Sequence, residues 1–377
     1  MRRRRFLAAS ATGLASLSSW VQACVRRAAA AGERAAAWTI VDADAGFGVE
    51  STSDRRGDVL IVRDDAGRKV IYRMPWQEDE SDSGPAAPPI RLAVVGHDAT
   101  DPLVPVRDGP FWSDPARWLL WREGATIHAF GTAGERQELT LPAVPTTLLR
   151  PALQRAGGDV IVFALSGDRR RIDQLRFPRA NGARTEIMRS ISLPAVASVG
   201  VAAFAGSGLR IATCESQNQT TTLMLVDPAA EATVRSAVVS GATRIPNASP
   251  SIQILAGGDV VVGALVTTVT GIALAEARFA ASSGAVPSVS MRELGRFNEA
   301  PSAAVVLYRQ ESRAMNVVAQ AVVRLVDGTF MHLNEAGMLE RTTYEFPPVV
   351  PLVLAPTRRG ALLLCCDPVN GPRMVGA

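Results

Sequence analysis

The sequence predicts an all-β fold, and three of its features lead to that prediction. Short runs of β-branched and apolar residues follow one another, with Gly, Pro, Asn and Asp between them. A motif recurs about every fifty residues. The apolar spacing of an amphipathic helix is hard to find after residue 38. With 377 residues, 47% of them hydrophobic, the chain can bury a large core.

The recurring motif is a glycine turn followed at once by a β-branched or apolar run. Its clear copies begin at Gly57, Gly158, Gly208, Gly258 and Gly360. The intervals between them are 101, 50, 50 and 102 residues, all near multiples of fifty. Two weaker copies, which begin at Ala116 and Arg313, fill the long gaps. The motif therefore predicts seven repeated units.

Each unit is predicted to contain four short strands. The fifth unit shows the pattern, with strands expected at Ser251–Leu255, Val260–Val266, Gly271–Phe279 and Pro287–Leu294. Seven four-stranded units of about 40–50 residues resemble the blades of a β-propeller of the WD40 or YVTN type. The resemblance implies a single propeller domain over residues 38–377. A β-helix is the alternative, but its repeats are shorter.

The two ends of this domain predict how a ring would close. The seventh unit offers three strands, at Val350–Leu354, Ala361–Cys366 and Arg373–Val375. At the other end, Trp38–Asp42 is one strand more than the first unit needs. We expect it to be the outer strand of the last blade, paired near Arg373–Val375, which would remove an open sheet edge. The acidic segment Gln77–Pro89 is expected to be a solvated loop.

Residues 1–23 are predicted to be an export signal, outside the fold. An Arg-rich start precedes the moderately apolar segment Phe6–Val21, which is too short and polar for a good membrane span. The run Arg3–Leu7 resembles the twin-arginine signal, although Ala8 stands where Lys is usual. An ordinary secretory signal is the alternative. Both routes take the protein out of the cytoplasm.

The segment Val21-Gln22-Ala23-Cys24 resembles a bacterial lipobox, in which the cysteine is acylated. The resemblance implies a lipid anchor at Cys24 and a membrane-anchored lipoprotein. Plain cleavage after Ala23, which would leave a free periplasmic protein of a Gram-negative-type bacterium, is equally open. Residues 24–37 are rich in Ala and Arg and are predicted to be a tether.

Export also changes the charge balance. The chain has 40 basic and 36 acidic residues, and four of the basic residues lie in the signal, so the mature protein has 36 of each. A nucleic-acid partner therefore does not follow from the basic pI. The four cysteines are too few for a disulfide scaffold, and we expect no structural disulfide.

Patterns typical of catalysis or metal binding are missing from the sequence. The three histidines His97, His128 and His332 are far apart, and no pair has metal-ligand spacing. His128 and His332 are expected within strands. No Gly-x-Ser-x-Gly elbow occurs. The sequence thus predicts no catalytic residues, no metal and no cofactor.

Aromatic residues are densest in one short segment. Phe111, Trp112, Trp118 and Trp121 lie within eleven residues of one another. Core packing accounts for some of them, and an exposed remainder would be a partner site, since Trp is enriched at binding hot spots. The run Arg169–Arg171 is predicted to be a hairpin tip.

Two functions remain open. The first is a non-catalytic binding or scaffold propeller of the cell envelope, a monomer whose partner, a protein or a glycan, contacts loops on one face. The second is a propeller-based enzyme, a lyase or glycan hydrolase, with polar residues at one mouth of the channel. With the strands placed as predicted, the loops at that mouth carry the polar residues His97, Asp98, Asp101, Glu215, Asn218, Arg244, Asn247, Asn298 and Asp367.

Overall fold

The structure is a computed structural model of the whole chain. It describes residues 38–44, 55–65, 68–78, 83–85, 90–95, 99–107, 116–131, 136–154, 159–178, 184–197, 199–205, 208–229, 233–246, 248–255, 257–282, 284–310, 317–334, 336–341, 353–357, 360–367 and 371–376. The export signal, Cys24 and the tether lie outside these residues. The chain forms two compact units. The terminal unit comprises Met1–Gly124, His128–Arg136 and Phe346–Ala377, and the central unit comprises Ala125–Ile127 and Gln137–Glu345.

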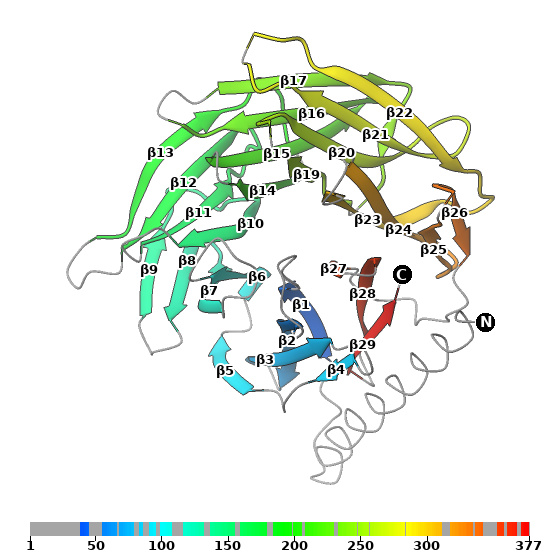
Figure 1. Cartoon of the computed structure of the whole chain (residues 1–377). Coiled ribbons are helices and arrows are strands. Elements are labelled where there is room, and N and C mark those ends of the chain that lie inside the picture. The colour runs from blue at the N-terminus through cyan, green and yellow to red at the C-terminus, as the bar shows by residue number, and fades with distance from the viewer. Residues whose placement is uncertain are drawn as a thin grey trace. The chain divides into compact units, whose positions relative to one another are not determined.

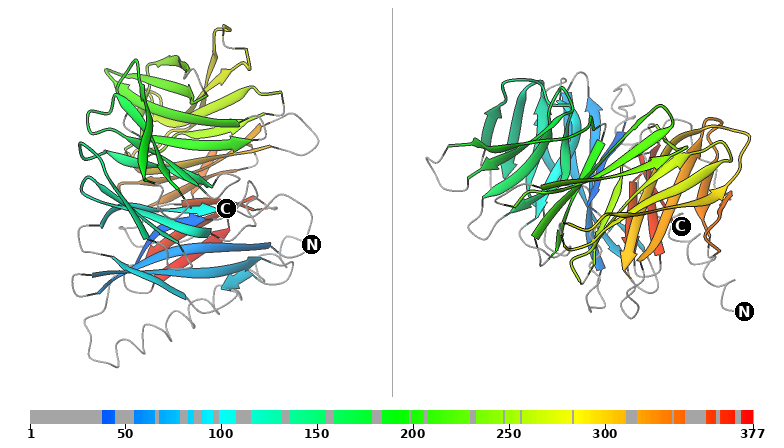
Figure 2. Two further views of the ribbon diagram at one scale, coloured as in Figure 1. Left: turned by 90° about the vertical axis from the view of Figure 1, so that its left-hand side faces the viewer. Right: turned by 90° about the horizontal axis from the view of Figure 1, so that it is seen from above.

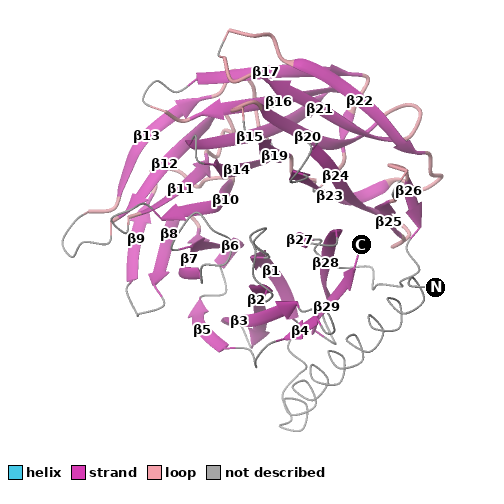
Figure 3. Cartoon of the chain, in the orientation of Figure 1, coloured by secondary structure: helices cyan, strands magenta, loops and turns pink. Residues whose placement is uncertain are grey.

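The predicted all-β class is confirmed. Every regular element in the described residues is a β-strand, and none is a helix (Figure 3). The strands form several antiparallel sheets in which neighbours along the chain pair with each other. In the described part of the chain, no helix is long and apolar enough to span a membrane.

The central unit consists mainly of four antiparallel meanders that follow one another in chain order (Figures 1 and 2). The first contains β10 (Thr147–Gln154), β11 (Val160–Leu165), β12 (Arg171–Phe177) and β13 (Glu186–Ser192). The second contains β14 (Val199–Ala205), β15 (Gly208–Gln217), β16 (Thr220–Asp227) and β17 (Thr233–Ser240). The third contains β18 (Thr243–Arg244), β19 (Ser251–Ile254), β20 (Val260–Thr267), β21 (Ile272–Phe279) and β22 (Ser288–Gly295). The fourth contains β23 (Pro301–Gln310), β24 (Val317–Leu325), β25 (Phe330–Leu333) and β26 (Leu339–Arg341).

The remaining strands belong mostly to the terminal unit. They are β1 (Trp38–Asp44), β2 (Arg55–Asp65), β3 (Arg68–Glu78), β4 (Ser83–Pro85), β5 (Ile90–Val95), β6 (Ala99–Arg107), β7 (Ala116–Glu123), β8 (Thr126–Gly131), β27 (Val353–Thr357), β28 (Gly360–Asp367) and β29 (Gly371–Gly376). Strand β9 (Arg136–Thr140) lies in the central unit from Gln137 onward. As expected, the last repeat supplies three strands, β27–β29.

The predicted pairing of Trp38–Asp42 with the last repeat is wrong. Strand β1 pairs with β2, with Ile40 opposite Ile61, and β29 pairs with β28. The physical reason is local: β1 and β2 are close in sequence, so joining them costs less loop-closure entropy than a pairing across the whole chain. Strand β1 does lie beside β28 within the terminal unit. The first and last sheets are therefore neighbours without sharing a strand.

The acidic loop predicted at Gln77–Pro89 needs a smaller correction. Strand β3 continues to Glu78, and the three residues of β4 pair with its end, with Trp76 opposite Pro85. Strand β5 pairs with the beginning of β3. Two short strands therefore share the fourth position of this sheet.

Every copy of the sequence motif lies on, or leads into, the second strand of its series. These strands are β2, β7, β11, β15, β20, β24 and β28, and each pairs with the strand before it and the strand after it. The fifth repeat closely follows the expected strand bounds, as β19–β22. The number of blades and their closure into a ring stay predictions.

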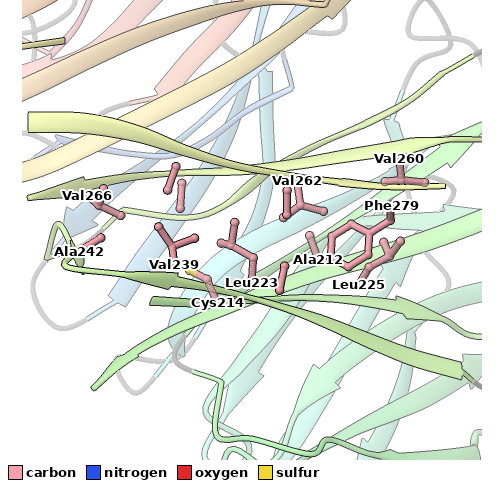
Figure 4. Close-up of a cluster of buried hydrophobic side chains, with 14 of the residues drawn as sticks. Ala212, Cys214, Leu223, Leu225, Val239, Ala242, Val260, Val262, Val266 and Phe279 are labelled. Carbon is pink, nitrogen blue, oxygen red and sulfur yellow. The ribbon is translucent and has the colours of Figure 1, made fainter. Parts of the chain in front are cut away.

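The meanders of the central unit pack face to face. Their first strands β10, β14, β19 and β23 lie next to one another in that order (Figure 1). The middle strands are apolar on both faces, and all six residues of β11 are buried. Three apolar clusters therefore fill the successive gaps between meanders. In one of them, Leu223 and Leu225 of β16 face Val262 of β20 and Phe279 of β21 (Figure 4).

Ion pairs recur at the start of the second strand in the first three meanders. Asp159 pairs with Arg176 at 2.8 Å, and Asp259, one hundred residues on, pairs with Arg278 at 2.8 Å. Between them, Arg210 pairs with Asp227 at 3.2 Å, with the two charges exchanged between the strands. The Gly-Asp of the motif thus supplies a carboxylate that ties the second strand to the third. We call this side of the central unit the ion-pair edge.

A second repeated contact joins each meander to the next. A side chain on the fourth strand donates a hydrogen bond to a backbone carbonyl in the turn between the third and fourth strands of the following meander. The donor and acceptor pairs are Gln137 and Pro178, Arg189 and Ala229, Arg235 and Ala280, and Arg292 and Gly337. We call these contacts the inter-sheet clamps. They recur at 40 to 45 residues between donor and acceptor.

A buried tyrosine also crosses between two meanders. Tyr308 of β23 is 5% exposed, and its hydroxyl donates to Glu276 of β21 at 2.8 Å. Burial, and the nearby Glu276 charge, raise the pKa of Tyr308 well above its usual value. The ring lies against Gly263 of β20, where a Cβ atom would be 1.7 Å from the hydroxyl oxygen. Glycine is therefore required at this strand position.

Replacing Gly263 with Ala tests this requirement. The added methyl group meets a ring that cannot leave its buried site, so we expect Gly263→Ala to lower the free energy of unfolding by about 1–3 kcal/mol. Urea unfolding measures the change. Gly257→Ala is the control, because a Cβ atom there meets nothing within 4 Å. Equal midpoints for the two variants would contradict the packing argument.

Arg235 offers a test of the clamps. Its guanidinium donates to Ala280 at 2.6 Å and to Ser282 at 3.3 Å, and it lies 5.5 Å from the centre of the Phe279 ring. We expect Arg235→Met, which keeps the aliphatic stem, to lower the free energy of unfolding by about 1–3 kcal/mol.

Arg296→Met is the matched control for this test, because Arg296 is 71% exposed and forms a surface ion pair with Glu293. Its urea midpoint should stay close to that of the wild type. A clamp variant as stable as this control would show that the clamps do not contribute to stability.

Candidate functional site

The best-defined surface of the central unit is the edge opposite the ion pairs. It contains the turns between second and third strands and the connections that lead from each meander to the next. The turns are at residues 167–170, 218–219, 268–271 and 326–329. The described connections are at 141–146, 193–197, 241–250 without 247, and 296–300. We call this surface the turn edge.

Backbone hydrogen bonds hold the first, second and fourth turns against a connection, and the third turn is closed by a bond from the N–H of Thr268 to the carbonyl of Gly271. The N–H groups of Leu193 and Ala197 donate to the carbonyls of Arg170 and Arg169 at 2.8 Å. The N–H of Ala242 donates to Gln219 at 2.9 Å in the next meander. Because these bonds recur, the turns are fixed in place along one edge of the unit.

Side chains then link the turns of neighbouring meanders. Arg169 of the first turn is 3.8 Å from Glu215, near the second turn. The hydroxyl of Ser216 is 2.7 Å from that of Thr221 and accepts from the N–H of Arg244 at 2.7 Å. Thr267 of the third meander donates to the carbonyl of Thr243 at 3.2 Å. The turn edge is thus one connected structure across these three meanders.

Glycine is required where the third turn meets its connection. Gly271 has a φ of +150°, and a Cβ atom there would be 2.2 Å from the carbonyl oxygen of Gly295. Three other turn residues, Arg169, Asn218 and Gln219, also have positive φ, which costs energy for a side chain other than glycine. Such strain is tolerated where the surrounding hydrogen bonds determine the backbone.

Exposed valines project from this edge. Val269, in the third turn, is 92% exposed, and Val326, in the fourth turn, is 63% exposed. Val144 is 51% exposed and lies beside the first turn, since its carbonyl oxygen contacts Gly167. Large apolar side chains held in water on rigid turns are available for contact with a partner.

Hydrogen bonds lower the pKa of three carboxyl groups on and near this edge. Hydrogen bonds from the Ser166 hydroxyl and the Arg170 backbone lower the pKa of Asp168. A hydrogen bond from Arg296 lowers that of Glu293, and the backbone and hydroxyl of Thr329 lower that of Asp327. These acids are engaged in structural bonds rather than poised for proton transfer. Within the described residues, no group of three His, Cys, Asp or Glu side chains could hold a metal ion.

Four of the polar residues predicted at a channel mouth have described side chains, and all four lie on the turn edge. Glu215 lies near the end of β15, Asn218 is in the following turn, Arg244 is in β18, and Asn298 is in the connection before β23. Arg244 donates to the carbonyls of Ile245 and Ala248 at 3.1 and 2.8 Å, so it braces its own connection. A catalytic role for these residues stays untested.

The other predicted site residues cannot be compared in this way. Asp101 lies in β6 and Asp367 in β28, but their side chains are not described. The residues outside the described part are Cys24, His97, Asp98, Phe111, Trp112 and Asn247. Trp118 lies in β7, again without a described side chain.

Trp121 is the member of the aromatic cluster whose surroundings are described. Its ring stacks on His128 with centroids 5.2 Å apart, and its N–H donates to Glu123 at 3.2 Å. His128 is also 3.7 Å from Glu123. Trp121 is partly buried in this group, so packing accounts for much of its surface.

The remaining predicted groups lie in structural positions. His128 and His332 are in strands β8 and β25, as expected. His332 is 3.1 Å from Glu340. Arg169–Arg171 is at the β11–β12 hairpin, also as expected, and Arg171 pairs with Asp173 at 2.9 Å. Cys214 has a free buried thiol whose pKa burial raises to about 12.

Sequence reasoning missed the exposed valines. A signal was present, because Val269 falls between two predicted strands, where turn residues are usually polar. The sequence could not show that Val269 and Val326 lie on the same edge.

Comparisons with known proteins give fold-level similarity alone. No protein-family model and no curated protein matches the sequence. Among solved structures, the chain is similar to one in the crystal structure of BBS1N in complex with ARL6DN, soaked with mercury, at 14% identity over 90% of this chain and 96% of the other, with a TM-score of 0.45. For the lead-soaked crystal of the same complex, the identity is 13% over 90% of this chain and 97% of the other, with a TM-score of 0.46. For the AfRom2 CNH domain, the identity is 11% over 74% of this chain and 83% of the other, with a TM-score of 0.38. At these TM-scores we draw nothing from them about function.

Proposed function

We propose that this protein is a non-catalytic binding protein of the cell envelope and that its partner, a protein, contacts the turn edge. The exposed valines on rigid turns carry the proposal. Val269 and Val326 would lose their contact with water in a complex, and burial of apolar surface contributes roughly 25 cal/mol per Å². The backbone bonds that fix the turns reduce the entropy lost on binding.

The chemistry of the edge favours a protein partner. Its charges are mixed, because Arg169 and Arg170 lie near Asp168 and Glu215. Neutral polar and apolar residues, such as Asn218 and Val269, are also exposed there. Nucleic-acid surfaces need a basic stripe, whereas protein interfaces combine apolar and neutral polar groups.

The fold proposed for this function is a seven-bladed β-propeller. Its support is the seven copies of the motif, each associated with the second strand of a series, and the fan of four meanders in the central unit. In such a fold the turn edge is one face of the ring, and a partner would contact several blades at once.

The cellular location is a proposal from the N-terminal sequence. The arginines and Phe6-Leu7 support export, and Val21–Cys24 supports acylation at Cys24. A lipid anchor would place the binding surface next to a membrane, with residues 24–37 as the tether.

Substitution of Val269 tests the binding surface. We expect Val269→Glu to weaken binding at least about tenfold, or ~1.4 kcal/mol, because a charge replaces an apolar contact. The partner is captured from the envelope fraction of the source cells, purified, and titrated against wild-type and variant protein.

Val286→Glu is the control for this titration. Val286 is 91% exposed, but it lies in the turn between β21 and β22, on the ion-pair edge. It should bind like the wild type. If Val269→Glu binds the partner as tightly as Val286→Glu and the wild type do, the turn edge is excluded as the contact. Turnover of a glycan or an ester by the pure protein would favour the enzyme alternative.

Export is tested by mass spectrometry of the mature N-terminus. We expect a chain that begins near residue 24, with a diacylglycerol and acyl mass on Cys24 if the anchor is present. A chain that keeps Met1 or Arg2 in the cytoplasm would refute export. An unmodified Cys24, or cleavage beyond it, would refute the anchor alone.

A further inference from the structure

Strand β22 is an open edge with unusual exposure. It pairs with β21 on one side, and in the described part of the chain no strand pairs with its other side. All six residues from Ser288 to Glu293 are exposed. Val289 is 44% exposed and Met291 is 47% exposed, and as alternate residues they share one face of the strand.

The charges on this edge lie at one end of its exposed segment, at Arg292 and Glu293. Natural proteins protect open edges with charged side chains, Pro or bulges. In β22 the guanidinium of Arg292 is directed to the carbonyl of Gly337 at 3.4 Å, and Glu293 accepts from Arg296 at 2.9 Å. The rest of the exposed segment, Ser288–Met291, consists of Ser, Val and Met and carries no charge that would oppose a second strand.

The other outer strands are less suited to pairing. Strand β13 also exposes two apolar residues, Ile187 and Met188, but its register with β12 shifts at this point, and a bulge twists an edge away. Strand β17 exposes one large apolar residue, Val238. The register of β22 with β21 is regular from Ser288 to Glu293. Of the three outer strands, β22 is therefore the one that combines a regular register with two exposed apolar residues on one face.

We propose that β22 pairs with β22 of a second copy of this chain, antiparallel about a two-fold axis at Ser290. Residues directly opposite in one sheet share a face, so this register places Val289 opposite Met291 of the other copy, twice. The two pairs form an apolar group of four side chains on the exposed face. Cross-strand apolar pairs each contribute to sheet stability.

Self-complementarity favours a second copy over a foreign strand. A two-fold interface brings the same patch of both subunits together. With the axis at Ser290, the residues brought opposite each other are Val289 and Met291, and both are apolar. The register centred on Met291 is less favourable, because it would place Val289 opposite Glu293. The proposal replaces the monomer expected from the sequence, and it does not depend on the turn edge.

Cysteine cross-linking tests the axis. At Ser290 the two copies of the residue are directly opposite, with Cα atoms about 4.5–5.5 Å apart, which lies within the Cα range of disulfides. We expect Ser290→Cys to give a covalent dimer under mild oxidation. Ser288→Cys is the matched control on the same strand and face, because its two copies would be roughly 13 Å apart. The wild-type protein, with its own cysteines, gives the baseline.

The proposal requires a several-fold higher dimer yield for Ser290→Cys than for Ser288→Cys, together with a concentration-dependent dimer of the wild type in sedimentation. Equal yields for the two variants would show random collision and overturn the register. A wild-type protein that stays monomeric at high concentration would overturn the pairing itself.

Discussion

The packing of one sheet face on another is the constraint on which the central unit depends. The middle strands are apolar on both faces, so both faces of each meander must pack against another element to be shielded from water. A helix layer is not present among the described elements, and the neighbouring meanders therefore supply the cover. Strand twist then brings the first strands together and spreads the outer strands, because twisted sheets that pack face to face cannot stay parallel over their whole width.

The polar contacts between meanders follow from this packing. The fourth strands are largely exposed, and an arginine there can reach the next meander without leaving water entirely. Arg189, Arg235 and Arg292 all do so, and each donates to a backbone carbonyl in a turn of that meander. Tyr308 makes a comparable contact nearer the first strands, and it occupies the space that Gly263 leaves.

The two edges of the central unit differ in a way that matters for function. On one edge, ion pairs such as Asp259 with Arg278 neutralise each other between adjacent strands. On the other, backbone bonds hold the turns, and side chains such as Val269 are left exposed. A surface that needs its side chains for its own stability is poorly suited to exchange them for a partner. The exposed valines of the turn edge are free of that conflict, because an apolar side chain takes no part in such bonds.

The sequence by itself determined the all-β class, the motif period and most strand bounds, since alternation and turn residues act over a few neighbours. The positions of β19–β22 and the hairpin at Arg169–Arg171 were predictable for this reason. The pairing of β1 with β2, the grouping of Glu215 with Arg169, and the shared edge of Val269 and Val326 were decided by the tertiary structure. Each depends on which strands become neighbours in space, and many pairings satisfy the same local pattern.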